Sequence, residues 1–539
     1  MKNPYKHIEL FAGCGGMSLG LDAAGFELYF ANELSPMAGE TFAYNILGEN
    51  LSALGNENKN PSKTLWIKSQ YKINDLKNRL RENPLEYRNG NYSDINVNTE
   101  FEKKLLIGSI DDLLNFLVQH KSLCKNLRKQ NIDVLSGGPP CQGFSLAGKR
   151  KKDDQKNLLP LSFARFAGLM QPKVVILENV KGITSPFKTD DGIKHFAWLE
   201  VAKAFSLKGF VPVCMLLNSK YFAIPQNRPR FILYAFRKDI FDKLKTKSSN
   251  TDITKAILLN SLLFFNKVRS KRKNLNDIKP SDISLYDIES DPKFFDGKLL
   301  PKLRTSKKNF ISAHYAIADI SSTKKIYELD KIKSNYPVHL KKLFKLKSKI
   351  TPTFLENHDE RNHGFEVKAR FRLYQVLNSL NGLKQDALQV ISGNCKDDEV
   401  FQKVFEGFKN EALLCESSEV QVFEKPISLQ SFKDYLKNIE SKKHSQRAIK
   451  KNEPAPAQMT IPDDLCHYDI KQLRTFTVRE MARFQSFPDW FVFQSKATTG
   501  GQQRKFEIPQ YTQVGNAVPP LLACELGKTI AKLLKSIER

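Results

Sequence analysis

Several features that would place a chain in a common class are missing from this sequence. Its eight cysteines form no C-x-x-C pair and no Cys/His cluster at zinc spacing, so we expect neither disulfides nor a metal site. No apolar run is long enough to cross a bilayer, and the N-terminal residues lack the apolar segment of a secretory signal. No repeat of fixed period is present. These absences predict a cytoplasmic protein with no membrane partner.

Negative charge is also scarce. The 539 residues include 85 Lys and Arg against 58 Asp and Glu, which gives a net charge of +27. Apolar residues make up 41% and charged residues 27%, as in an ordinary globular protein, and the length predicts about two to four domains. Such an excess of positive charge serves to neutralise a polyanion, and nucleic acid is favoured over an acidic membrane surface.

Strand-like and helical segments alternate in the first part of the chain. Residues 8–33 contain an apolar run, a glycine-rich turn, a helical stretch and a second apolar run, and further strand-like runs follow at 104–110, 132–138 and 173–180. This alternation predicts an α/β fold whose sheet is covered by helices on both faces. The runs that come next, 211–219 and 230–236, are joined by about ten residues, which is too short for a crossover helix. We therefore expect that pair to be antiparallel and the sheet to be mixed.

Changes in composition divide the chain into three parts. Residues 1–240 carry the strand and helix alternation, interrupted by an Asn- and Lys-rich insertion at about 48–100. A Lys-rich second domain is expected at 241–470. Well-patterned sequence returns at 471–539, and its last helix, from residue 520, is expected to pack back on the sheet.

The turn "FAGCGGMSLG" predicts a nucleotide-like ligand. Its glycines let the backbone approach a ligand closely, but Ser18 stands where a dinucleotide fingerprint has its third glycine, which disfavours a pyrophosphate. Glu33 ends the second strand twenty residues after Gly13, where a carboxylate can hold two ribose hydroxyls. S-adenosylmethionine has this form, and Phe11 could face its sulfonium. The alternative is a glycine turn that serves only packing.

A second set of reactive residues is predicted at the carboxyl ends of the strands. In "GGPPCQGFS" two prolines stop a strand and present Cys141 on a glycine-rich loop, as for a nucleophile. Glu178 ends the next strand, where a buried carboxylate suits a proton donor. Arg228 and Arg230 in "QNRPR" should lie at the same edge because the strand that they begin is reversed. The alternatives are an inert buried thiol, a structural acid paired with an arginine and a plain basic surface.

Six segments resemble, in order, those of the DNA cytosine-5 methyltransferases, and the chain looks like a bacterial restriction-modification type member. They are "FAGCGGMSLGLDAAGF", "GGPPCQGFS", "ENVKG", "QNRPRFIL", "TVREMARFQSFPD" and "QVGNAVPP". The resemblance implies the Rossmann-like methyltransferase fold, S-adenosylmethionine as methyl donor and a monomer that acts on a specific duplex DNA sequence. It also implies protection of host DNA against a companion endonuclease, and makes 241–470 a target-recognition domain.

The resemblance also implies roles for the catalytic residues. Cys141 would add to carbon 6 of a cytosine flipped out of the duplex, which lets carbon 5 accept the methyl group. Glu178 would bind ring N3 and the exocyclic amine, and Arg230 would hold the carbonyl O2. Asn179 and Arg228 would position the loop and Glu178.

The same resemblance implies two further sets of contacts. Those to the methyl donor are Phe11, Gly13, Gly15, Gly16, Ser18, Leu19, Glu33, Ser109, Ile110, Pro139, Leu159, Asn516 and Val518. Those to DNA are Gln142, Ser145, Lys149, Arg150 and Gln226. One departure concerns Ser109, because the family often has an Asp there that meets the adenine amine; either Asp111 or main-chain atoms near Ile110 must serve instead.

Other functions on related chemistry make different demands on the sequence. A zinc deaminase needs a P-C-x-x-C arrangement, and Phe144 stands where its second cysteine belongs. An RNA cytosine-5 methyltransferase and a catalytically silent DNA-binding regulator remain as alternatives on the same fold.

Overall fold

The computed structural model of the chain describes residues 4–538 with several gaps. The segments outside the description are 87–90, 141–158, 189–193, 248–250, 322–326, 347–351, 418–419 and 440–445, with the single positions 381, 396 and 459.

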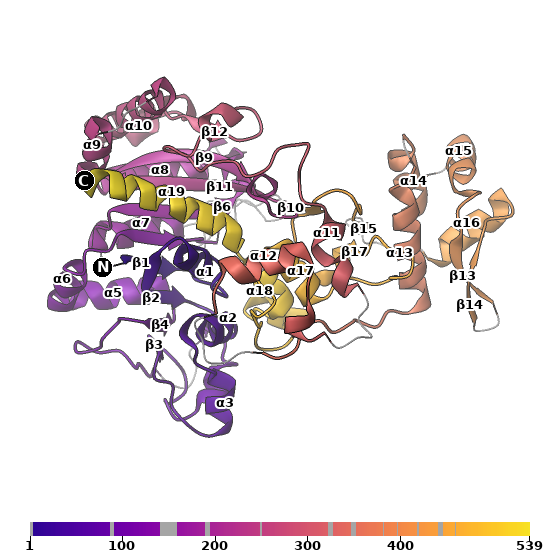
Figure 1. The fold of residues 1–539 in the computed structure, drawn as a ribbon, viewed down its shortest axis with the longest axis horizontal. Helices are drawn as coiled ribbons and strands as arrows, with labels where there is room; N and C mark the ends of the chain where they lie inside the picture. Colours follow the sequence, from indigo (N-terminus) through magenta and orange to yellow (C-terminus); the bar gives the residue numbers. More distant parts are fainter. Residues whose placement is uncertain are drawn as a thin grey trace.

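A nine-stranded sheet forms the centre of the described chain (Figure 1). In spatial order its strands are β12 (Leu285–Asp287), β9 (Phe210–Asn218), β11 (Pro229–Arg237), β6 (Val174–Val180), β5 (Val134–Gly137), β1 (Tyr5–Leu10), β2 (Phe26–Glu33), β4 (Lys104–Ile107) and β3 (Thr64–Trp66). Only β11 is antiparallel to its neighbours, β6 and β9; all the other pairs are parallel. The predicted antiparallel pair and the mixed sheet are confirmed.

Helices cover both faces of this sheet, because successive strand residues point to opposite sides. In β6, Val174 and Ile176 belong to one apolar core, whereas Val175 and Leu177 belong to the other. The first face is covered by α1 (Gly16–Ala23), α9 (Lys238–Lys247) and α19 (Pro520–Glu538). The second is covered by α5 (Ile110–Gln119), α6 (Lys121–Arg128), α7 (Leu159–Met170) and α8 (Ala197–Leu207).

The insertion supplies β3, the edge strand of the sheet, and packs beside it. It contains α3 (Leu51–Asn56), β3 and α4 (Leu76–Arg79). Fully buried Arg79 pairs with Asp94 at 2.6 Å, and its guanidinium lies 5.2 Å from the ring centre of Trp66. Arg81 pairs with Glu40 of α2 (Pro36–Phe42) at 2.9 Å, so the insertion also contacts the helix that follows Glu33.

The chain stays with the sheet well beyond residue 240. Helix α10 (Asp252–Ser270) packs on α8 and β9, and β12 extends the sheet beside β9. Residues 241–287 were predicted to belong to the second domain, but they build the edge of the first. An uncovered edge strand exposes unpaired backbone groups. This Lys-rich segment covers the β9 edge, and residues such as Ile257 and Phe264 are buried there.

The chain between β12 and residue 470 has a part near the sheet and a part remote from it. Near the sheet lie α11 (Ala313–Ile317), α12 (Asn335–Leu343) and three short strands. Of these strands, β16 (Ala455–Pro456) pairs with β10 (Gln226–Asn227) of the preceding part, and β15 (Arg447–Ala448) pairs with β17 (Leu465–Cys466).

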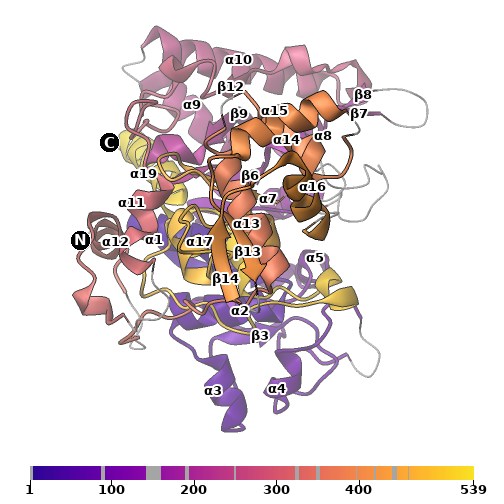
Figure 2. The same ribbon diagram turned by 90° about the vertical axis from the view of Figure 1, so that its right-hand side faces the viewer.

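Residues 364–439, here called the distal lobe, project from the rest of the molecule (Figures 1 and 2). The lobe contains α13 (Phe365–Leu377), α14 (Lys384–Ile391), α15 (Asp398–Phe408), β13 (Leu413–Ser417), β14 (Val420–Glu424) and α16 (Leu429–Asn438). These elements share an apolar core, which also includes Ala448 of β15 and Cys466 of β17. Here, "body" denotes everything outside the lobe.

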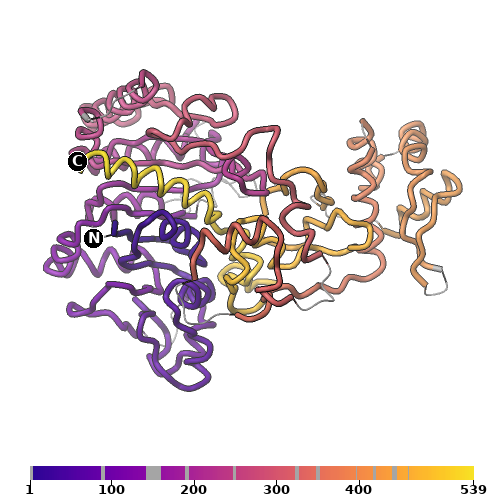
Figure 3. Tube along the Cα trace, in the orientation of Figure 1, coloured from indigo at the N-terminus to yellow at the C-terminus, as the bar shows by residue number. Residues whose placement is uncertain are grey.

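The last part of the chain returns to the sheet. Helices α17 (Val478–Phe484) and α18 (Gln510–Asn516) lie between the sheet and the distal lobe, and α19 packs along α1. The two ends of the chain therefore lie on the same side of the molecule (Figure 3). The predicted final helix is confirmed. Among the described residues, no helix is both long and apolar enough to cross a bilayer.

Candidate active site

Three distant segments meet at one edge of the sheet. Strand β5 runs into Gly137, which pairs with Leu177 in β6, and Asn179 near the end of β6 pairs with Phe231 near the start of β11. Because β11 is reversed, its first residues lie beside the last residues of β6. The strand arrangement therefore brings "GGPP", "EN" and "QNRPR" together, as predicted.

Glu178 and Arg230 form a buried ion pair at this edge. Arg230 Nε lies 2.8 Å from Glu178 Oε1, and the two side chains are 11% and 9% exposed. Burial lowers the pKa of Arg230, whereas the neighbouring Glu178 carboxylate opposes that shift. A Cβ on Gly138 would stand 2.9 Å from Glu178 Oε2, so the glycine leaves the space in which the second carboxylate oxygen lies.

Asn179 holds the start of the loop that carries the predicted nucleophile. Its Nδ2 donates to the Pro139 carbonyl at 2.9 Å, and its Oδ1 accepts from the backbone N–H of Val180 at 2.9 Å. Cys141 follows Pro139 by two residues and lies outside the described residues. The predicted DNA contacts Gln142, Ser145, Lys149 and Arg150 lie outside them too.

Among the described residues, the Arg228 side chain contacts the far end of the chain rather than Glu178. Its Nη2 donates to the carbonyls of Gly515 at 2.8 Å and Ala517 at 3.1 Å, and the residue is 1% exposed. Burial lowers the pKa of Arg228 well below its usual value, and the charge of Arg230 lowers it further. Within the described chain, the partners of the Arg228 side chain therefore lie in the 514–517 turn.

Gln226 is not available to DNA. It is 0% exposed, its Nε2 donates to the Phe484 carbonyl at 3.1 Å, and its Oε1 accepts from the backbone N–H of Gln458 at 3.3 Å. Pairing of β10 with β16 covers this residue. Sequence reasoning placed it at the correct edge but could not foresee the segment that covers it.

The glycine turn and Glu33 form an open cradle. The N–H groups of Gly13 and Ser35 donate to the two oxygens of Glu33 at 2.7 and 2.8 Å. Burial raises the pKa of Glu33, and these two hydrogen bonds oppose the rise. Gly13 has φ +54°, and a Cβ there would meet no atom within 4 Å, so open space lies in front of the turn. Gly15 has φ +98°, a conformation that favours glycine.

Two of the residues predicted to contact the methyl donor lie on the second face of the sheet. Phe11, with φ +53°, packs edge to face on Phe163 of α7 at 6.2 Å between ring centres. Leu159 begins α7 and is half-buried beside the same core.

Ser18 and Leu19 point away from the cradle. Ser18 is 1% exposed and donates its hydroxyl to Glu9, while His7 Nε2 lies 3.3 Å from the same hydroxyl. Burial raises the pKa of Glu9 to about 8. Leu19 is 4% exposed and belongs to the core under α1. Both side chains are thus engaged in the interior of the protein.

Ser109 caps α5 instead of facing the cradle. Its Oγ accepts from the backbone N–H of Asp111 at 3.1 Å, and Ser162 donates to Asp111 Oδ1 at 2.7 Å. Buried Ile110 follows the cap. The Gly108 N–H donates to the Glu33 carbonyl at 2.9 Å, which places this strand end beside the cradle.

The returning segment closes the cradle on the side of α1. A Cβ on Gly16 would stand 2.3 Å from the Val518 carbonyl oxygen, so backbone meets backbone here. Gln513 ties this segment to α2, because its Oε1 accepts from Thr41 Oγ1 at 2.6 Å and its Nε2 donates to the Met37 carbonyl at 3.2 Å. Asn516 is exposed and Val518 is 9% exposed.

Gln485 is a residue that sequence reasoning missed. It ends α17, is 0% exposed, and donates from Nε2 to the Val514 carbonyl at 2.7 Å. The available signal was a polar pair, Gln485 and Ser486, between the aromatic residues Phe484 and Phe487 in "REMARFQSFPDWF". Ser486 has φ +66° and accepts from the Leu521 N–H at 3.1 Å.

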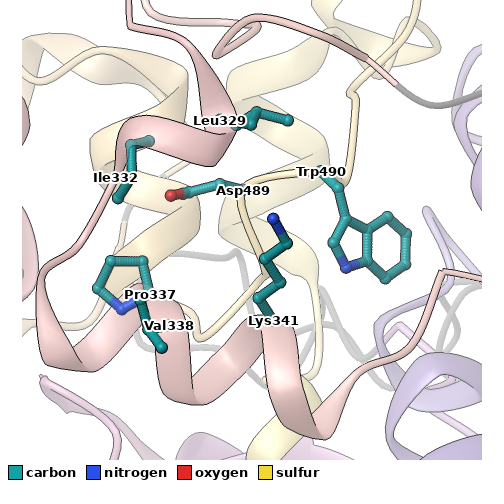
Figure 4. A pocket seen from close by; sticks show the side chains of 7 residues that line it. All are labelled: Leu329, Ile332, Pro337, Val338, Lys341, Asp489 and Trp490. Atoms are coloured by element: carbon teal, nitrogen blue, oxygen red, sulfur yellow. The ribbon is translucent and has the colours of Figure 1, made fainter.

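A shallow pocket elsewhere contains none of the predicted site residues (Figure 4). It is lined by Leu329, Ile332, Pro337, Val338, Lys341, Asp489 and Trp490. Asp489 pairs with Arg483 at 2.7 Å, and Trp490 Nε1 donates to the Phe344 carbonyl at 3.0 Å. Its polar groups are thus engaged in packing. No cluster of His, Cys, Asp and Glu among the described residues could hold a metal ion.

Comparison with known proteins agrees with this geometry. The family model for C-5 cytosine-specific DNA methylases matches residues 5–69 and 101–532. The chain therefore belongs to that family, which makes it a DNA (cytosine-5)-methyltransferase that uses S-adenosylmethionine. The family match skips residues 70–100, which lie within the insertion.

Individual relatives are distant. The type II methyltransferase M.DdeI of Desulfomicrobium norvegicum is 24% identical over 531 residues, which cover 98% of this chain and 89% of that protein. M.XorII of Xanthomonas oryzae is 25% identical, with 98% and 85% covered. The solved S. pombe Dnmt2 methyltransferase is 13% identical over 98% of both chains, with a TM-score of 0.39.

Proposed function

We propose that this protein methylates carbon 5 of a flipped cytosine within a specific duplex DNA sequence, as the modification enzyme of a restriction-modification system. The observation that carries the proposal is the buried Glu178–Arg230 pair beside Gly138, at the sheet edge from which the Cys141 loop departs. The relatives M.DdeI and M.XorII, which are type II methyltransferases, support the restriction-modification assignment.

The cytosine ring is recognised and activated at that edge. Glu178 binds N3 and the exocyclic amine, and Arg230 both orients Glu178 and holds O2. The Cys141 thiolate forms a bond to carbon 6, which makes carbon 5 nucleophilic. After carbon 5 has gained the methyl group, a base removes its proton and the carbon–sulfur bond breaks, which restores the aromatic ring and the thiolate.

The cradle fits the methyl donor. The two Glu33 oxygens are oriented by backbone N–H groups, among them those of Gly13 and Ser35, and a carboxylate has lone pairs enough to accept from ribose hydroxyls as well, while the space at Gly13 is open. S-adenosylmethionine would supply an electrophilic methyl group there. Phe11 offers an aromatic face, while Asn516 and Val518 close the cradle from the returning segment.

The recognition region is assigned to residues 313–475, which include the distal lobe, rather than to all of 241–470. Support comes from the packing of α10 and β12 on the large sheet, which removes 241–287 from that region. The protein acts as a monomer beside a companion endonuclease specific for the same sequence.

The test is expression in a host that lacks cytosine methylation, followed by bisulfite sequencing. We expect 5-methylcytosine at one short sequence, and its absence with Cys141→Ser. A silent regulator would leave the genome unmodified yet bind DNA, and an RNA enzyme would modify only RNA. Duplex DNA containing 5-fluorocytosine at that sequence should become covalently attached to the wild-type protein, because the fluorine cannot leave as a proton does.

A further inference from the structure

Two buried side chains from distant parts of the chain grip the same turn. Gln485 Nε2 donates to the carbonyls of Val514 at 2.7 Å and Ala517 at 3.4 Å. Arg228 Nη2 donates to Gly515 at 2.8 Å and to the same Ala517 oxygen at 3.1 Å. Both side chains are at most 1% exposed. We call this pair the clasp.

The gripped turn is part of the donor cradle. Its next carbonyl, that of Val518, rests against Gly16 at a distance that no side chain at position 16 would allow. Asn516 projects from the turn into solvent. Because α1 supports the turn from one side and the clasp holds it from the other, the clasp determines where Asn516 and Val518 stand.

The clasp is also rigidly connected to the base pocket. Arg228 lies two residues before Arg230, and Arg230 is paired with Glu178. Arg230 lies in β11, which is hydrogen-bonded on both sides. Arg228 directly precedes that strand and is held beside β9, because its N–H donates to Asn218 Oδ1 at 3.0 Å and its carbonyl accepts from the Ser219 N–H at 3.1 Å, so a displacement of one arginine is transmitted to the other. One short segment thus contacts the donor side through Arg228 and the cytosine side through Arg230.

Each of the two clasp side chains has one polar atom without a hydrogen-bond partner among the described residues. These atoms, Arg228 Nε and Gln485 Oε1, are buried. One is a donor and the other an acceptor, and both side chains reach the same Ala517 oxygen. Leaving both atoms unpaired costs free energy, so the clasp stores a preference for any arrangement that satisfies them.

We propose that Arg228 and Gln485 are positioning residues that couple binding of the methyl donor to binding of the target cytosine. This inference rests on the proposed function. When the cytosine engages Glu178 and Arg230, the start of β11 is drawn toward the base, and the clasp carries the 514–517 turn onto the donor. The methyl donor then binds the protein–DNA complex more tightly than the free protein, and DNA binds the protein–donor complex more tightly by the same factor.

The decisive measurement is the affinity for S-adenosylhomocysteine, the demethylated product, determined by calorimetry with and without duplex DNA carrying the target sequence. We expect the DNA to tighten wild-type binding at least about fivefold. In Gln485→Met, which keeps the length but removes both polar atoms, we expect about tenfold weaker binding and a tightening factor near one. Affinity for DNA alone should remain within about twofold. Gln119→Met, on the exposed end of α5, is the matched control and should behave as wild type.

Three results would overturn the coupling. In the first, DNA does not tighten binding of S-adenosylhomocysteine to the wild type, and in the second, Gln485→Met shows the same tightening as the wild type. In the third, Gln485→Met loses affinity for S-adenosylhomocysteine and for DNA equally, which would indicate a merely structural role. If Gln485→Met does not fold, Arg228→Lys is tested instead. This substitution keeps the positive charge but shortens the side chain that donates the hydrogen bonds, so DNA should tighten binding of S-adenosylhomocysteine less than in the wild type. A wild-type protein that binds no S-adenosylhomocysteine would contradict the proposed function itself, whereas normal binding with an unchanged factor would contradict only the clasp.

Discussion

The body and the distal lobe differ in charge. The lobe, residues 364–439, contains ten basic and eleven acidic residues, whereas the rest of the chain contains 75 basic and 47 acidic ones. Attraction to phosphates depends on an excess of positive charge, so the body must supply the sequence-independent part of DNA binding. We propose that the lobe serves the other task, in which shape and individual contacts distinguish one sequence from another.

The two regions also differ in how their contacts are distributed along the chain. In the body, Thr41 binds Gln513 and Arg228 binds Gly515, so its polar network joins segments hundreds of residues apart. In the part of the lobe beyond α13, core contacts such as those of Phe405 and Phe408 with Phe432 join residues close in sequence. Helix α13 itself is tied to the body, because Gln375 Nε2 donates to the His467 carbonyl at 2.9 Å. Local contacts of this kind define a unit that can open by itself. The comparison therefore predicts that damage to the lobe leaves the chemistry of the body intact.

The largest effect is expected in the body, at Glu178. Glu178→Gln keeps the shape of the side chain but removes the carboxylate that Arg230 binds, and it cannot donate a proton in the same way. We expect a loss of about a thousandfold in kcat. Single-turnover methylation of the target duplex measures it. Glu406→Gln, in the lobe, should keep kcat within about twofold, and a comparable loss there would break the comparison.

A cavity in the lobe should remain local. Phe432 is 1% exposed and packs on Phe405 and Phe408. Phe432→Ala should cost about 3 kcal/mol and accelerate hydrogen exchange in α15 and α16, but not in β6. Affinity for S-adenosylhomocysteine should not change. The matched body variant Phe163→Ala, which removes the ring beside Phe11, should weaken that affinity, and equal effects of the two variants would contradict the division into regions.

Filling the space beside the Glu178 carboxylate is expected to have a smaller effect on kcat. In Gly138→Ala the new Cβ must displace Glu178 Oε2, which the pair with Arg230 holds in place. We expect kcat to fall about tenfold while affinity for S-adenosylhomocysteine is kept. Gly364→Ala, at the start of the lobe, is the control, because a Cβ there would meet nothing within 4 Å. Unchanged kcat in Gly138→Ala would show that the carboxylate has room to move.

How far the sequence predicts this site depends on the range of the contacts. The strand ends that carry Glu178 and Arg230 were predictable, because a ten-residue connection allows only a reversed strand and thereby one common edge. The partners of Arg228 and the burial of Gln226 were not, since each depends on a segment more than 200 residues away. Residues 241–287 were assigned by composition, and composition does not show that Ile257 and Phe264 of a Lys-rich segment face a sheet.

Titration should also distinguish the regions. Burial raises the pKa of Glu9 from its ordinary 4.5 to about 8, so the folded protein keeps a proton that the unfolded chain releases between these values. Stability from this group is fully present below pH 4.5 and is lost as pH rises through 8. Glu9→Gln can still accept from Ser18 but does not titrate.

Urea unfolding at pH 5, 7 and 9 provides the measurement. The free energy of unfolding of wild type should fall relative to Glu9→Gln by about 1 kcal/mol or more across this range. Glu399→Gln, exposed in α15 of the lobe, should show no such difference from wild type. A constant difference between wild type and Glu9→Gln at all three pH values would mean that Glu9 is ionised in the folded protein.

The smallest effect is expected from the lobe's own lysines. Lys384, Lys425 and Lys437 are exposed, and we expect their joint replacement by Gln to leave the dependence of DNA affinity on salt unchanged. If each contacted a phosphate, the slope of log K against log salt would fall by about 2.7 in magnitude, since each contact contributes about 0.9. A titration of non-specific duplex DNA between low and moderate salt separates these outcomes. A fall of that size would assign phosphate binding to the lobe despite its balanced charge, whereas a constant slope with altered sequence preference would assign it base recognition alone.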